Sequence, residues 1–161
     1  MDDTEAMGIA LAEAAEATTH GDVPVGAVVV LDGRVLAARH NERELTGDPT
    51  AHAELLALRD AAAAVGAGWR LDGATLVVTL EPCPMCAGAV IASRMAAVVF
   101  GAADPRSGAA GSAYNLCVDP RLGHEARVRG GLRAAEATAL LDRFFAARRA
   151  PTRSGPDANV L

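Results

Sequence analysis

The spacing of apolar residues changes along the chain from a helical period to a strand period. Within residues 4–19, apolar side chains recur at helical spacing and predict a first helix. Residues 26–40 (GAVVVLDGRVLAARH) instead hold two β-rich runs joined by Asp32-Gly33. An Asp-Gly pair between such runs is typical of a tight hairpin turn, so this segment predicts two antiparallel strands.

The remainder of the chain continues to alternate between the two patterns. Beyond the hairpin we expect helices over 51–65, 82–94 and 132–149, strands over 74–80, 96–102 and, shorter, 126–129, and loops over 41–50 and 104–112. Helices that alternate with strands after an initial hairpin predict an α/β protein, a three-layer α/β/α sandwich around a central mixed five-stranded sheet. No repeat or linker divides the sequence, so we expect a single domain over 1–150 and a disordered tail over 151–161.

The composition limits the possible classes of protein. The 161 residues suffice for one domain with a core, 51% of them are apolar, and no apolar run is long enough to span a membrane. The N-terminal segment MDDTEAMG is acidic and lacks the basic start of a signal peptide, so a cytoplasmic location is expected. In a reducing compartment, closely spaced cysteines more often serve metal or redox chemistry than a disulfide.

The charge is unevenly distributed. The net charge of −5 argues mildly against a general nucleic-acid-binding protein. Residues 121–161, however, hold eight arginines and four acids, whereas residues 1–120 hold seven arginines and sixteen acids. The chain has no lysine. This bias either reflects the composition of the genome or supplies arginines for phosphate contacts and base stacking.

Two short motifs contain the residues best suited to bind a metal ion. His52 and Glu54 stand in D-P-T-A-H-A-E, and Cys83 and Cys86 stand in E-P-C-P-M-C, each motif at the start of a predicted helix. Cysteines three apart share a helix face, and a helix N-terminus favours the thiolate that a metal requires. One histidine and two cysteines suit a catalytic zinc ion with a fourth position for water. Glu54 is not needed as a ligand and could move a proton to or from that water.

Each of these residues also has a simpler interpretation. A lone C-x-x-C motif is compatible with a redox pair or half of a zinc ribbon, His52 with a helix cap, and Glu54 with a solvated acid. A ribbon requires a second C-x-x-C motif, and Cys117 is the only further cysteine. A redox pair does not require H-A-E upstream. The four residues in this order, each at a predicted helix start, favour a zinc-dependent catalytic site.

The combined motifs H-x-E and P-C-x-x-C are the pattern of zinc-dependent nucleobase deaminases. Beyond them, the sequence resembles the bacterial tRNA-specific adenosine deaminases of the cytidine and deoxycytidylate deaminase superfamily. The matching segments are VPVGAVVV (23–30), DPTAHAELLALR (48–59), TLEPCPMCAGA (79–89), VVFGAADPRSGAAGS (98–112) and LLDRFFAARR (140–149). Deaminases of guanine, cytosine, cytidine and riboflavin precursors share the two short motifs, whereas the Gly-rich loop and the terminal helix favour the tRNA enzymes.

This resemblance implies a cytidine deaminase-like fold and a hydrolytic reaction that converts the wobble adenosine of an arginine tRNA (anticodon ACG) to inosine. It implies one Zn²⁺ per chain, bound by His52, Cys83 and Cys86, with Glu54 as the catalytic proton shuttle. It also implies a homodimer, the tRNA anticodon stem-loop as partner and no membrane association. The residues implied to contact the substrate are Asn41, Ala53, Asp104, Arg148 and Arg149.

Several alternatives remain open from the sequence. Asn41 could be a turn residue, Asp104 could open an ordinary turn, and the terminal arginines could be solvated charges. Gly123 stands where many relatives carry an asparagine before a histidine, which bears on the choice of substrate rather than on the chemistry. A deaminase of a free base or nucleoside is the main alternative function. A noncatalytic zinc-binding or RNA-binding module and a redox protein are more distant ones.

Overall fold

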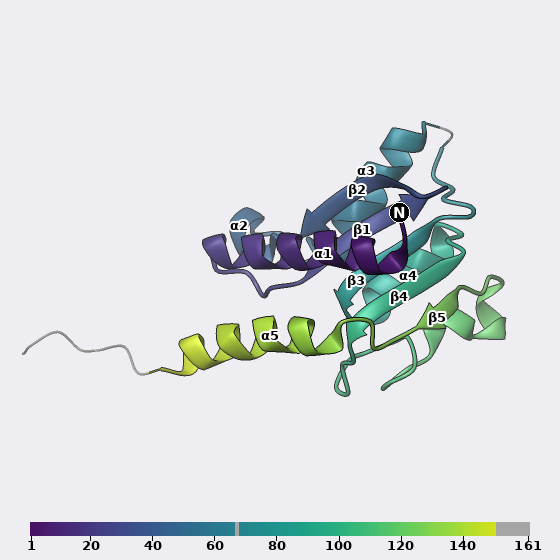
Figure 1. Ribbon diagram of the computed structural model, residues 1–161. Coiled ribbons are helices and arrows are strands. Elements are labelled where there is room, and N and C mark those ends of the chain that lie inside the picture. The colour runs from purple at the N-terminus through teal and green to yellow at the C-terminus, as the bar shows by residue number, and fades with distance from the viewer. Residues whose placement is uncertain (67, 151–161) are drawn as a thin grey trace, which may run out of the picture.

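The strands form one mixed five-stranded sheet in the order β2-β1-β3-β4-β5 (Figure 1). The computed structural model describes residues 1–66 and 68–150, so the tail predicted over 151–161 lies outside the described residues. The strands are β1 (Gly26–Leu31), β2 (Arg34–His40), β3 (Thr75–Leu80), β4 (Ala97–Ala102) and β5 (Arg127–Arg129). β1 is antiparallel to β2 and β3, whereas β3, β4 and β5 are parallel, so the predicted mixed sheet is confirmed.

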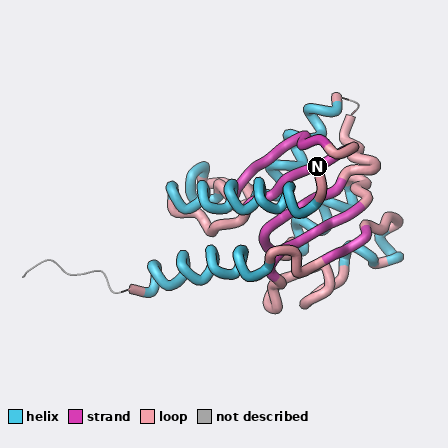
Figure 2. Tube along the Cα trace, viewed as in Figure 1, coloured by secondary structure: helices cyan, strands magenta, loops and turns pink. Residues whose placement is uncertain are grey.

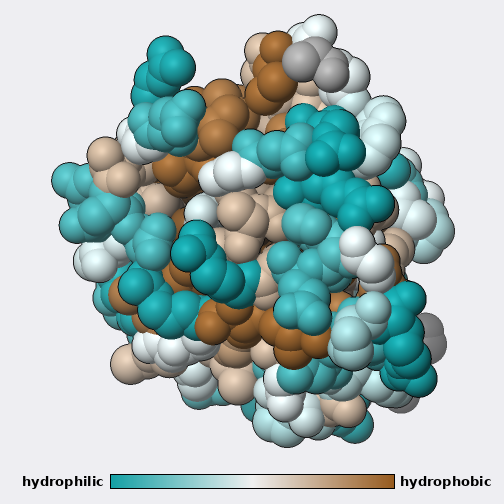
Figure 3. Space-filling model, turned by 90° about the vertical axis from the view of Figure 1, so that its right-hand side faces the viewer, coloured by the Kyte–Doolittle hydropathy of each residue, from teal (hydrophilic) through white to brown (hydrophobic). Residues whose placement is uncertain are grey.

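Helices cover both faces of this sheet (Figures 1 and 2). α1 (Asp3–Ala17) and α5 (Ala134–Arg149) lie on one face, and α3 (Ala53–Val65) and α4 (Pro84–Ala92) lie on the other. This arrangement confirms the predicted three-layer α/β/α sandwich. None of the described helices is both long and apolar enough to cross a membrane. The end of the molecule at the right of Figure 1 presents hydrophilic areas broken by apolar patches (Figure 3).

Side chains that alternate along the strands build the core between the layers. On the α1 side, the buried cluster contains one valine from each of three neighbouring strands, Val28, Val77 and Val99. Val29 and Val78, the next residues on two of these strands, belong instead to the larger cluster beneath α3 and α4. This is the period of two residues that a strand imposes. Each fully buried valine stabilises the fold by roughly 1.5–3 kcal/mol.

α1 approaches β1 very closely at Gly26. A methyl group built on this glycine would lie 1.9 Å from the carbonyl oxygen of Ala10 and 2.6 Å from the amide nitrogen of Ala14. Glycine is required here because no side chain fits between the helix and the strand. The contact holds the start of β1 in place, next to Val23 and Val25, which line the site described below.

The polar segment predicted as a loop over 41–50 contains a one-turn helix, α2 (Arg43–Thr46), which corrects the prediction. The cause is a long-range contact. The buried Asp22 carboxylate accepts hydrogen bonds from the amides of Glu44 at 2.9 Å and Leu45 at 3.1 Å. These are unpaired donors of the first helical turn, so an acid from another part of the chain caps α2.

Several helix ends also differ from the prediction by one or two residues, among them the starts of α4 and α5. α4 begins at Pro84 rather than at Pro82, because Cys83 is its N-cap and a proline is well tolerated in the first turn. α5 begins after Arg133, which adopts a left-handed conformation with φ 51°. Only Ala137 of α5 is buried. The terminal helix therefore packs lightly on the sheet and leaves most of its length accessible.

Candidate active site

The side chains of His52, Cys83 and Cys86 converge where β3 ends. His52 is the N-cap of α3, Cys83 is the N-cap of α4, and Cys86 lies in the first turn of α4. His52 Nδ1 lies 3.7 Å from Cys83 Sγ and 3.5 Å from Cys86 Sγ. All three atoms lie within 4.8 Å of one another. The structure thus brings together the three residues that the two motifs indicated.

These distances fit a tetrahedral zinc ion. Zn–N bonds of about 2.0–2.1 Å and Zn–S bonds of about 2.3 Å place the nitrogen and the sulfur about 3.5 Å apart in tetrahedral geometry. One imidazole nitrogen and two sulfurs are also ligands that zinc prefers. Three protein ligands leave one position open, as in catalytic rather than structural zinc sites. The residues present therefore fit a catalytic zinc ion.

Contacts among these residues shift their pKa values. The hydrogen bond with Cys86, which outweighs the effect of burial, and the bond with His52 lower the pKa of Cys83 to about 4. The bond with Cys83 raises the pKa of His52 in turn. The bond with Cys83 and burial also raise the pKa of the Cys86 thiol. The site thus favours a Cys83 thiolate, and a metal ion would displace the protons that remain on the other two ligands.

Glu54 lies in the first turn of α3. It lines a pocket of about 170 Å³ that His52 and Cys83 also line. The residue is only 4% exposed. Burial, partly offset by a hydrogen bond from its own amide, raises the pKa of its carboxyl group. Glu54 is not a member of the metal-binding group formed by His52, Cys83 and Cys86. A buried carboxyl group of this kind beside a metal site can accept and release a proton.

Asn41 connects the segment before β1 to the first turn of α3. Its Nδ2 donates a hydrogen bond to the Val23 carbonyl at 3.1 Å, and its Oδ1 accepts one from the Ala53 amide at 2.9 Å. The side chain is buried and lines the pocket. One amide hydrogen and one oxygen lone pair remain for a ligand. Ala53, predicted as a substrate contact, is fully buried with its amide engaged by Asn41, and it does not line the pocket.

The Gly-rich loop forms another wall of the pocket through Asp104 and Ser107. The Asp104 carboxylate accepts hydrogen bonds from the amides of Arg106 at 3.0 Å and Ser107 at 3.2 Å, and from the Ser107 hydroxyl at 2.7 Å. Asp104 therefore opens a turn, as the simpler interpretation holds. A carboxylate offers about four acceptor sites, so about one remains for a ligand. The structural role and the predicted substrate contact are compatible.

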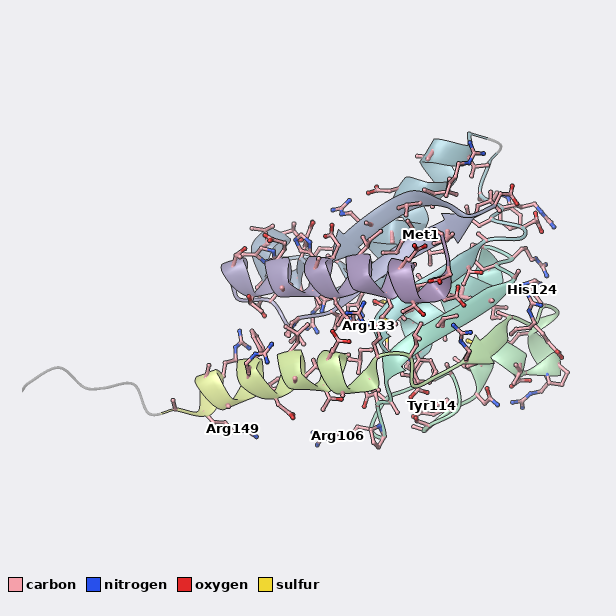
Figure 4. All side chains as sticks on the ribbon, in the orientation of Figure 1. Met1, Arg106, Tyr114, His124, Arg133 and Arg149 are labelled. Atoms are coloured by element: carbon pink, nitrogen blue, oxygen red, sulfur yellow. The ribbon has the colours of Figure 1, made fainter. Side chains whose placement is uncertain are left out.

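Arg148 and Arg149, the last two residues of α5, differ in their position relative to the pocket. Arg148 donates from Nη2 to the Gly21 carbonyl at 2.8 Å, and its guanidinium lies 4.6 Å from the centre of the Phe144 ring. It lines a second cavity of about 230 Å³ that shares Asn41 and other wall residues with the metal pocket. Arg149 is exposed at the end of α5, on the side that faces away from α1 (Figure 4). The structure thus brings Arg148 to the site and leaves Arg149 apart from it.

Among the lining residues that sequence reasoning missed, two are charged, Arg43 and Glu81. Arg43 lines both cavities and was taken as part of a polar loop. Glu81 is 2% exposed and lines the metal pocket, while its carboxylate binds the Gly-rich loop. The sequence signal that could have identified Glu81 was its position between a buried strand and the Pro-Cys motif. An acid at such a position is rarely buried without hydrogen-bond partners, so partners elsewhere in the chain could have been expected.

Two residues whose roles the sequence left open lie outside the pocket. Gly123 has a φ of 70°, in the left-handed region, which asparagine also adopts more readily than most residues. The backbone of this turn therefore accommodates glycine, and also the asparagine that the resemblance places at this position. Cys117 is fully buried, and burial raises the pKa of its thiol to about 11. Cys117 is a core residue.

The chain belongs to the family of the cytidine and deoxycytidylate deaminase zinc-binding region, whose model matches residues 1–102. This region includes all three predicted metal ligands and Glu54. The protein thus carries a zinc-binding deaminase domain, and its His52, Cys83 and Cys86 can hold the metal.

Several proteins similar to this chain have names that refer to tRNA. The chain is 49% identical to the tRNA-specific adenosine deaminase of Bacillus subtilis over 136 residues, 84% of each chain. It is 40% identical to the tRNA-specific adenosine deaminase of Streptococcus pyogenes, over 84% of this chain and 85% of that protein. It is also 47% identical to a part of the tRNA(Ile)-lysidine synthase of Deinococcus radiodurans, over 96% of this chain but only 27% of that protein.

Solved structures of similar chains share this fold. One chain comes from a study of A-to-I editing by tRNA:A34 deaminases at the wobble position of transfer RNA. It matches with a TM-score of 0.82 and 43% identity, over 86% of this chain and 99% of that chain. A guanine deaminase from Bacillus subtilis matches with a TM-score of 0.63 and 37% identity, over 70% of this chain and 71% of that chain.

Proposed function

We propose that this protein converts the wobble adenosine of an arginine tRNA with the anticodon ACG to inosine by hydrolytic deamination. The observation that carries the proposal is the metal-binding group of His52, Cys83 and Cys86, because His52 and Cys83 line the same pocket as the buried Glu54. A purely structural zinc site has no use for a non-ligand acid at this place. The 49% identity to a tRNA-specific adenosine deaminase supports tRNA as the substrate, which would place the enzyme in the cytoplasm.

The residues of the pocket have distinct roles in this proposal. His52, Cys83 and Cys86 hold a zinc ion, which when bound makes water nucleophilic at neutral pH. Glu54 takes a proton from the attacking water and delivers it to the amino group, which leaves as ammonia. One water is consumed and one ammonia is released for each inosine. Asn41 orients the adenine through its remaining amide hydrogen and oxygen lone pair.

RNA would reach the pocket across a rim that carries arginines. Arg43 and Arg106 are exposed and form no ion pair with any described residue, and Arg148 lines the adjoining cavity. By contrast, several arginines elsewhere pair with acids: Arg39, Arg70, Arg121, Arg129 and Arg133. Guanidinium groups that are not neutralised by acids suit phosphate contacts. We infer that this local rim, with Arg149 as an outer contact, attracts the anticodon stem-loop despite the net negative charge.

Asp104 is proposed to bind the sugar of the target nucleotide. Its position in the pocket wall and its remaining acceptor site support this role. Ala53 is proposed to contribute only through the backbone that places His52 and Glu54, because its own amide already donates to Asn41.

We infer that residues 1–150 act as a single domain and that two copies form a homodimer through α3 and α4. An open hollow of about 560 Å³ lies over these helices, lined by apolar groups that include Leu55, Leu58 and Ala89. Trp69, at its edge, is 59% exposed. Exposed apolar surface with an aromatic residue is typical of protein interfaces. Sedimentation should give twice the mass of 16.4 kDa, and Trp69→Asp should give the monomer.

A second candidate is the deamination of a free purine such as guanine. The 37% identity to a guanine deaminase favours it, because the same metal ligands and acid would serve that reaction. A free base, however, requires no arginine rim. The two candidates therefore differ in whether RNA is needed for turnover.

An inosine assay separates these candidates. The protein is incubated with an anticodon stem-loop of arginine tRNA bearing ACG, and in parallel with adenine, guanine, cytosine and cytidine, with Glu54→Ala as control. Inosine at the wobble position in the wild type and not in the control is the expected result. Ammonia from a free base without inosine in the RNA would overturn the tRNA assignment and retain the zinc chemistry.

A further inference from the structure

We propose that Glu81 is a positioning residue that holds the Gly-rich loop as a fixed wall of the substrate pocket. The inference rests on the proposed function, because it assigns this wall to substrate binding. The Glu81 side chain lies at the end of β3 and is 2% exposed. Its carboxylate accepts hydrogen bonds from the amides of Asp104 at 3.0 Å, Ala110 at 3.1 Å and Ser112 at 3.0 Å, and from the Ser112 hydroxyl.

The backbone around Glu81 adds two further links to the same loop. The Glu81 amide donates to the Ala102 carbonyl at 2.8 Å, just before the loop begins. The Ala109 amide donates to the Pro82 carbonyl at 2.8 Å, near the end of the loop. Cys83 follows directly. The same short segment therefore presents a metal ligand and anchors the loop, so the loop has a defined position relative to the metal.

Gly108 shows how closely the loop wraps around the carboxylate. A methyl group built on this glycine would lie 2.4 Å from Glu81 Cδ and Oε2, and 2.5 Å from the Asp104 carbonyl oxygen. No side chain fits between the loop and the acid. The loop thus encloses Glu81, and the carboxylate sets the shape of the turn that carries Asp104 and Ser107 into the pocket.

The negative charge and the acceptor character of Glu81 are both needed. A carboxylate offers about four acceptor sites, and four donors point at this one. Burying a charge is unfavourable unless it is fully hydrogen-bonded, and the loop supplies that bonding. A glutamine side chain has the same shape but carries an amide NH2 group, a hydrogen-bond donor, in place of one carboxylate oxygen. At least one loop donor would then face another donor, and the loop would move away from the pocket.

Steady-state kinetics on the anticodon stem-loop tests the proposal. Glu81→Gln should raise KM at least about tenfold, the loss expected for one charge-assisted hydrogen bond, while kcat changes less than about threefold. Zinc content should stay at the wild-type level. Glu16→Gln makes the same chemical change at an exposed position of α1 and should behave as wild type. An unchanged KM in Glu81→Gln would overturn the proposal.

A double-mutant cycle separates positioning from general destabilisation. If Glu81 acts by holding Asp104 in the wall, Glu81→Gln should change KM little in an Asp104→Ala background. Independent, multiplying effects would contradict that role. Ser112→Ala keeps the three amide hydrogen bonds and removes one, so it should fold and raise KM by a smaller factor. It serves as the test if Glu81→Gln does not fold, and a wild-type KM in Ser112→Ala would then refute the anchor.

Amide hydrogen exchange tests the anchor without reference to any substrate. In Glu81→Gln, the amides of Ala110 and Ser112 should exchange at least about tenfold faster than in the wild type, while the amides of β1 stay unchanged. Equal protection in both proteins would overturn the inference, whatever the substrate proves to be. If the wild type forms no inosine but the loop amides exchange faster in the variant, the proposed function fails and the anchor stands.

Discussion

Replacing Asn41 with alanine tests how the fold supports the first turn of α3. The substitution removes the hydrogen bond from Asn41 Nδ2 to the Val23 carbonyl and the one from the Ala53 amide to Asn41 Oδ1. Each buried partner that is left unpaired costs about 1–3 kcal/mol, so the two together cost about 2–6 kcal/mol. Because Asn41 lines an open pocket, water can replace part of this bonding, and we expect the lower end, about 2 kcal/mol.

Urea unfolding followed by circular dichroism measures this loss directly. The matched control is Asn115→Ala, because Asn115 is exposed and its side chain forms no hydrogen bond with any described residue. The control should change the free energy of unfolding by less than about 0.5 kcal/mol. Asn41→Asp keeps an acceptor for the Ala53 amide but places an oxygen against the Val23 carbonyl, so it should also destabilise the protein.

The effect should extend to the metal site, since the Ala53 amide lies between His52 and Glu54. We expect Asn41→Ala to bind zinc more weakly, as loss of outer support typically lowers metal affinity about 10–100-fold. A free energy of unfolding within about 0.5 kcal/mol of the wild type would refute the assignment of these two hydrogen bonds as structural supports.

Three further predictions concern the acid, the ligands and the pH dependence. Glu54→Gln should retain zinc and fold while kcat falls about 10²–10⁴-fold, because only the proton carrier is lost; near-normal turnover would exclude that role. Cys83→Ala should lose zinc and melt at a lower temperature, whereas Cys117→Ala should keep its zinc, as measured by metal analysis and thermal unfolding. Burial acts to raise the pKa of Asp22, but the α2 amides and His20 outweigh it and hold the pKa below 3.8. A lowered pKa means that the charged carboxylate stabilises the fold above about pH 4 and that this contribution is lost as the pH falls below it. The difference in unfolding free energy between wild type and Asp22→Asn should therefore shrink between pH 5 and pH 3, to be followed by urea titration; a constant difference would contradict the shift.

The sequence by itself determined the layers of the fold and the core of the site. Apolar periodicity and turn residues act within a few positions of one another, so the sandwich, the hairpin and most helices followed from local patterns. The metal ligands could also be predicted from the sequence, because H-A-E and P-C-x-x-C each place their residues within one helical turn. The resemblance to tRNA deaminases added the expected roles of Asn41 and Asp104.

Only the tertiary structure decided what depends on contacts between distant segments. His52 and Cys83 are 31 positions apart, and packing of α3 and α4 on the same face of the sheet sets their separation. α2 forms because Asp22 caps it from outside, and Glu81 gains its role because a loop more than twenty residues away closes around it. Local propensity contains no information about such partners. Buried polar groups must nevertheless find them, because leaving them unpaired destabilises the fold.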